Sequence, residues 1–178
     1  MPYESTNIPN DKPSFMAAIS GLVPAASATD IFTISGKAGR IIRINQIQIS
    51  GIATSATAIP IFVARRSALN TGGTSTPVAA VNMDTANAGS AAGATVLAYT
   101  ANPSGLGTLV GNIATARMIL STASASVGTA PIVFSFERMY MKLPTLRDTN
   151  EMLVLNYGGA TAAGNSVDIS ISWTEEGA

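Results

Sequence analysis

The sequence contains neither cysteine nor histidine, and these two absences exclude several classes of chemistry. Without cysteine no disulfide bond can form, and without either residue no zinc site of the Cys/His type is possible. A Ser-His-Asp triad and a Cys-His pair are excluded within this chain for the same reason. We therefore expect a protein that is not an enzyme and that holds no cofactor and no metal ion.

Charged residues are also scarce, at 11% of the 178 residues. An average soluble protein carries about 25%. Ten basic residues balance ten acidic ones, so the formal net charge is zero. Proteins that bind nucleic acid or an anionic membrane usually carry a basic patch. We therefore expect neither nucleic acid nor a membrane among the partners of this protein.

Aromatic residues make up only 6% of the chain, whereas alanine, glycine, serine and threonine fill nearly half of it. A weakly charged surface of small residues is poorly suited to free solubility and better suited to packing against neighbouring subunits. We therefore expect the chain to bind itself, most simply as a homotrimer.

Residues 1–29 differ in composition from the rest of the chain. They hold four of the nine prolines and show no sustained alternation of apolar and polar residues. This pattern predicts an extended N-terminal arm, which lies either on its own domain or on a neighbouring subunit. The apolar residues of the arm, which we expect to anchor it, are Phe15, Met16, Ile19, Leu22 and Val23.

From residue 30 to residue 178 the pattern indicates β-structure. Apolar and polar residues alternate in short runs that loops rich in glycine, alanine, serine and threonine separate. The strongest run, residues 40–50, changes parity near Asn45-Gln46. A β-bulge there would bring the isoleucines on both sides to one face, because one extra residue shifts the alternation by one.

Eight or nine such strands and the lack of a long helical period predict one antiparallel β-sandwich that resembles a jelly roll. The domain is expected over residues 30–178. Its predicted core consists of Ile42, Ile44, Ile47, Ile49, Ile61, Val63, Phe134, Val154, Val167, Ile169, Ile171 and Trp173.

The most distinctive loop follows Arg65 and Arg66, which end a predicted strand. It contains Gly72-Gly73 among hydroxyl side chains, so its backbone N–H groups could bind an anion. The loop lacks the spacing of a phosphate-binding loop, and a plain sheet connection flanked by arginine ion pairs is the alternative that we favour. Arg65 and Arg66 are therefore candidate interaction residues.

Several stretches together resemble a family of small structural proteins of tailed bacteriophages and prophages, over roughly residues 30–176. These stretches are IQISGIAT (47–54), RRSALNTGGT (65–74), AYTANP (98–103), LGT (106–108) and ISWTEE (171–176). The resemblance implies a virion protein that is assembled in the host cytoplasm.

Within the virion, the expected role is that of a capsid decoration or cement protein that binds and stabilises the phage head shell. Its partners would be other copies of itself and the major capsid protein or another virion subunit. A tail or fibre subunit is the first alternative. A carbohydrate-binding or adhesin-like module is the second, but it would need exposed aromatic residues, and Trp173 is in phase with the core.

Overall fold

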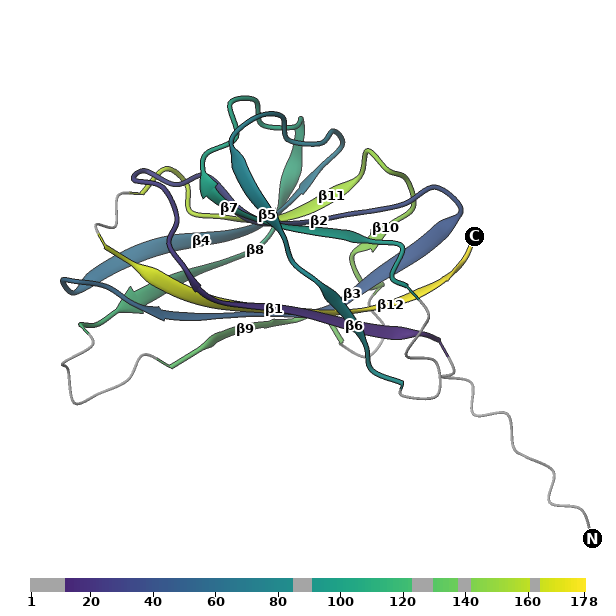
Figure 1. Ribbon diagram of the computed structural model, residues 1–178, viewed down its shortest axis with the longest axis horizontal. Helices are drawn as coiled ribbons and strands as arrows, with labels where there is room; N and C mark the ends of the chain where they lie inside the picture. The colour runs from purple at the N-terminus through teal and green to yellow at the C-terminus, as the bar shows by residue number, and fades with distance from the viewer. Residues whose placement is uncertain (1–11, 85–90, 123–129, 138–141, 161–163) are drawn as a thin grey trace, which may run out of the picture.

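The computed structural model describes residues 12–84, 91–122, 130–137, 142–160 and 164–178. Within these ranges the chain forms strands joined by turns and bends, and it contains no helix. No described helix could therefore cross a membrane. The strands form two antiparallel sheets, which Figure 1 shows as an upper and a lower layer. The predicted all-β class is confirmed, and the arrangement is sandwich-like.

The first sheet, sheet A, has the order β10-β3-β12-β1-β6, with β9 also paired to β3. Its strands are β1 (Ser14–Leu22), β3 (Arg40–Ile52), β6 (Ala80–Asn82), β9 (Ile132–Ser135), β10 (Thr145–Leu146) and β12 (Ser166–Gly177). Sheet B has the order β5-β7-β2-β11-β4-β8. Its strands are β2 (Asp30–Ser35), β4 (Thr57–Arg66), β5 (Thr74–Pro77), β7 (Thr95–Ala101), β8 (Leu109–Leu120) and β11 (Met152–Asn156).

All the predicted core residues are buried, and Phe134, at 9% exposed, is the least so. One of them packs differently from the rest. Val154 lies with Ala64 and Met152 in a separate small cluster, whereas the others belong to the main core between the sheets. Residues 152–155 of β11 are buried on both faces of the strand, so Leu153 and Leu155 face the main core and Val154 faces away from it.

The predicted β-bulge is present and lies at Asn45. Gln46 pairs with Ser172 and Ile44 pairs with Trp173, so Asn45 is the extra residue of β3. The two core isoleucines before the bulge and the two after it are at most 2% exposed. The bulge therefore restores a common inward face, as the change of parity indicates.

The segment Ser14–Leu22 forms strand β1, which corrects the expected arm over residues 1–29. This strand lies inside sheet A, paired with β12 on one side and β6 on the other. The Phe15 ring is 2% exposed and stacks on Trp173, with ring centroids 5.8 Å apart. The boundary at residue 30 therefore does not separate an arm from a domain. Residues 1–11 of that arm lie outside the described residues.

Replacing Phe15 with alanine tests whether β1 belongs to the core. We expect Phe15→Ala to lower the free energy of unfolding by about 3–5 kcal/mol, because it removes a buried ring from the main core. Met16→Ala is the matched control, because Met16 faces outward on the same strand and is 38% exposed. Its effect should stay within about 0.5 kcal/mol. Urea unfolding measures both, and equal midpoints for the two variants would contradict this assignment of β1.

Candidate functional site

A pocket of about 760 Å³ lies where the edges of the two sheets come together, lined by β8 on one side and by β9 and β10 on the other. The bulge in β3 explains its position. Beyond Asn45 the edge of β3 pairs with β9, and before Asn45 it pairs with β10. Among the described residues, two separate strands therefore share this edge of β3, one on each side of the bulge. The volume lies within the range of about 300–1,000 Å³ that is typical of ligand pockets.

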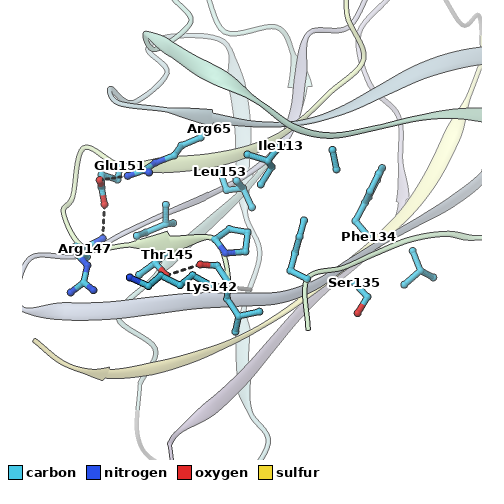
Figure 2. A pocket seen from close by; sticks show the side chains of 15 residues that line it. Arg65, Ile113, Phe134, Ser135, Lys142, Thr145, Arg147, Glu151 and Leu153 are labelled. Carbon is cyan, nitrogen blue, oxygen red and sulfur yellow. Dashed lines mark hydrogen bonds and ion pairs between the residues drawn. The ribbon is translucent and has the colours of Figure 1, made fainter. Parts of the chain in front are cut away.

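The pocket has an apolar wall and one charged end. The apolar side chains that line it are Ile113, Ala114, Val133, Phe134, Phe136, Leu143, Pro144, Leu146 and Leu153. The charged side chains are Arg65, Lys142, Arg147 and Glu151. Figure 2 shows Arg65, Arg147 and Glu151 grouped at one end and Phe134 at the other. The pocket is therefore amphipathic, with three basic groups and one acidic group.

The acidic group offsets only one of the three basic charges, and both of its oxygens are engaged within this chain. Glu151 Oε1 lies 2.5 Å from Arg65 Nη2, and Glu151 Oε2 accepts a 2.6 Å hydrogen bond from the backbone N–H of Arg147. The side chains of Lys142 and Arg147 are exposed and form no ion pair with any described residue. The Nε atom of Arg65 is buried and makes no hydrogen bond within the described chain. This end of the pocket therefore favours an anionic group.

Arg66, the second candidate arginine, is in a different place and is not accessible. Its Nε and Nη2 donate to the two oxygens of Asp30 at 2.7 and 2.9 Å, and Nη1 donates to the carbonyl oxygen of Gly107 at 2.7 Å. Asn70 and Asn156 also donate to Asp30, which is 0% exposed. Because every partner belongs to the chain itself, the two arginines do not form one anion site, and the plain sheet connection is the better interpretation of this loop.

The Gly-Gly turn in that loop has a structural reason. Gly72 and Gly73 have φ angles of 63° and 77°, in the left-handed region that glycine tolerates best. A Cβ atom on Gly73 would lie 2.6 Å from the carbonyl oxygen of Asn102. Glycine is therefore needed for the close approach of the two loops.

The residues expected to anchor an arm do not form one surface. Phe15 and Leu22 are buried in the chain's own core, and Ile19 packs against that core. Phe15 and Leu22 therefore cannot contact a neighbour while β1 is in place, which corrects that expectation. Met16 and Val23 are 38% and 55% exposed, and for these two a contact with another subunit stays a prediction.

The aromatic residues within the described ranges do not form a sugar-binding platform. Tyr99, Tyr157 and Trp173 are all at most 5% exposed. Burial raises the pKa of Tyr157, and burial together with the charge of Asp30 raises the pKa of Tyr99. Both phenols therefore stay neutral at physiological pH. Nor do the described residues hold a group of three or more carboxylates that could bind a metal ion.

Beside the pocket, strand β8 forms the outer edge of sheet B and is largely exposed. Its exposed aliphatic residues are Leu109, Val110, Ile113 and Ile119, at 45–67%. Residues 113–120 alternate weakly in the sequence, which predicts a strand here but neither the pocket nor the exposed edge. The weak alternation of the strand was the available signal, because an edge that is exposed on both faces needs no strict apolar period.

Comparison of the chain with protein-family models, with curated proteins and with solved structures finds no match. The resemblance to phage structural proteins therefore stays a prediction from the sequence.

The adjacent arginines of β4 allow a matched test of the buried network. We expect Arg66→Met to lower the free energy of unfolding by about 3–5 kcal/mol, because it leaves the buried Asp30 carboxylate without its cation. The same change at Arg65, whose ion pair is partly exposed, should cost less than about 1 kcal/mol. Denaturant titration at neutral pH measures both values. A cost at Arg66 as small as that at Arg65 would show that the network does not stabilise the fold.

Proposed function

We propose that this chain is a non-enzymatic structural subunit of a bacteriophage particle, and specifically a decoration protein that binds and stabilises the head shell. The sequence resemblance suggests the particle. The observation that carries the proposal is the exposed apolar edge of sheet B, because such an edge suits a subunit that other subunits cover.

Strand β8 is long for an edge strand, and its second half is poorly protected. It runs for 12 residues, and Arg117 is its only charged residue. Natural sheets usually protect such an edge with charges, prolines, bulges or a covering segment. Register shifts interrupt its pairing with β4 in the first half, but from Ala114 to Leu120 the register is continuous. An exposed apolar strand of this kind is a surface for association.

We propose a second copy of the same chain as the occupant of this edge. The formal net charge of zero supports this choice, because copies without net charge do not repel one another. Symmetric self-association is also the commonest way in which soluble proteins assemble. The expected homotrimer would place one such contact between each pair of neighbouring subunits.

We further propose that the sandwich has jelly-roll topology. The nested pairing of the longer strands supports this: β1 pairs with β12, β2 with β11, β3 with β9, and β4 with β8. A long hairpin rolled into two sheets produces this nesting of first with last strands. Jelly rolls are found in viral capsid proteins and also in lectins, so the topology is compatible with a virion protein without selecting one.

Immunogold electron microscopy tests the location. Particles induced from the strain that carries this gene are labelled with an antibody against the purified chain. We expect gold on the heads. Label confined to tails would replace the decoration role with a tail or fibre role, and particles without label would contradict a virion role altogether.

A charge placed on β8 tests the edge as a contact between copies. We expect Ile119→Lys to raise the concentration at which the oligomer dissociates by about tenfold or more, because it places a charge in an apolar contact. Val81→Lys is the control, since Val81 is similarly exposed, at 62% against 67%, but lies on β6 of sheet A. Light scattering over a dilution series measures both. Equal dissociation of the two variants would rule out β8 as the contact.

A further inference from the structure

We propose that the pocket between β8, β9 and β10 binds residues 1–11 of a second copy of this chain. This inference rests on the self-association proposed above and assigns a second contact to it. The occupant is the segment that precedes the described residues, and the site is built entirely from described side chains.

The first argument is charge. The pocket carries three basic side chains and one carboxylate, which pairs with Arg65, so its charged end is positive in a chain whose net charge is zero. Residues 1–11 contain Glu4 and Asp11 and neither lysine nor arginine. An acidic segment therefore complements Lys142 and Arg147, which form no ion pair within the described chain.

The second argument is the apolar wall. Besides its acids, the segment carries Tyr3 and Ile8, which can fill a pocket lined by Phe134 and the neighbouring aliphatic residues. Tyrosine is among the residues that contribute most when they are buried in such pockets. Pro2 and Pro9 restrict the backbone of the free segment, so that binding costs less conformational entropy than it would for an unrestricted peptide.

The third argument concerns the path to the pocket, and it favours a second copy. Eleven extended residues span about 40 Å at most. To enter its own pocket the segment would have to leave Lys12, which forms an ion pair with Glu176 of β12, and pass over β12 and β3 to reach β10. Three strand spacings take up about 14 Å of that length, so the segment is long enough and the surface along the path decides.

The outer face of sheet A along that path offers little to the apolar residues of the segment. It presents Thr174, Arg43 and Thr145 in one row. The exposed strand β8, in contrast, adjoins the pocket directly, because Ile113 belongs both to its exposed residues and to the pocket wall. A neighbour that packs on β8 therefore lies next to the pocket with its whole segment available.

The test uses charge reversal in the full chain and relies on mixing. A pocket variant carries Lys142→Glu and Arg147→Glu, and a segment variant carries Glu4→Lys and Asp11→Lys. Each variant alone brings like charges together, so we expect its dissociation concentration to rise about tenfold or more above that of the original chain. In an equimolar mixture the acidic segment of the pocket variant meets the basic pocket of the segment variant. The basic segment of the segment variant likewise meets the acidic pocket of the pocket variant, so both contacts are attractive. We expect the mixture to dissociate at a lower concentration than either variant alone.

Lys37→Glu serves as the control, because it reverses an exposed charge that does not line the pocket. It is compared with Arg147→Glu alone, so that each changes the net charge equally. Sedimentation of a fluorescently labelled variant against an unlabelled one gives the dissociation concentrations. A wild-type chain that stays monomeric at high micromolar concentration would overturn the proposal. A mixture that dissociates at the same concentration as its components would also overturn it. That result is expected if each segment binds the pocket of its own chain, because a second copy cannot then restore the attraction.

The outcome is separable from that of the proposed function. The mixing experiment uses purified protein and is independent of particle labelling. A chain that is absent from virions can therefore still show restored association in the mixture. Conversely, gold on phage heads together with failed mixing would preserve the virion role and reject this pocket as the site for residues 1–11.

Discussion

The ion pair between Asp30 and Arg66 fixes the centre of sheet B and the loops above it. Asp30 begins β2 and Arg66 ends β4, while Asn156 reaches Asp30 from β11, which lies between them. The same network holds both covering loops, because Asn70 donates to Asp30 and Arg66 donates to Gly107. A buried ion pair usually costs as much in desolvation as it returns, unless its remaining hydrogen-bonding groups are satisfied. Here the carboxylate accepts four hydrogen bonds, and the planar guanidinium supplies two of them in parallel, which a lysine could not do.

The bulge at Asn45 connects the part of this fold that the sequence could predict with the part that it could not. Its position follows from local parity, because a strand with one buried face must keep its apolar residues in phase. Its consequence for the pocket is not local. The edge of β3 pairs with β9 on one side of the bulge and with β10 on the other, and these strands come from a distant part of the chain. No pattern within residues 40–50 indicates which strands will pair there, so the core face could be predicted and the pocket could not.

Strand β1 is an element that the sequence pattern does not predict, because its formation depends on a distant partner strand. Phe15, Ala17 and Ile19 do alternate with Met16, Ala18 and Ser20, but alanine adds little to an apolar period, and the flanking prolines are typical of irregular chain. What makes the segment a strand is its partner β12, more than 140 residues away, where Trp173 provides the ring that covers Phe15. The register also shifts between Ile19 and Leu22, so the parity of the strand changes within it. Whether each of the seven candidate interaction residues lies in the core or on the surface is therefore determined by long-range pairing.

The distribution of the few charges has a further consequence for assembly. Arg66 and Asp30 are buried together, Arg65 is held by Glu151, and Lys12 and Arg43 both pair with Glu176. Most of the surface is thereby left to small uncharged residues, which cannot direct a partner electrostatically. Lys142 and Arg147 form no ion pair within the described chain, and they lie beside an amphipathic pocket that shares Ile113 with the exposed edge of sheet B. An apolar edge contributes to the affinity for a partner but does not fix the orientation of the partner. Charges that are not neutralised fix that orientation. Because both occur side by side, one neighbouring subunit can cover the edge and have its orientation set by the pocket.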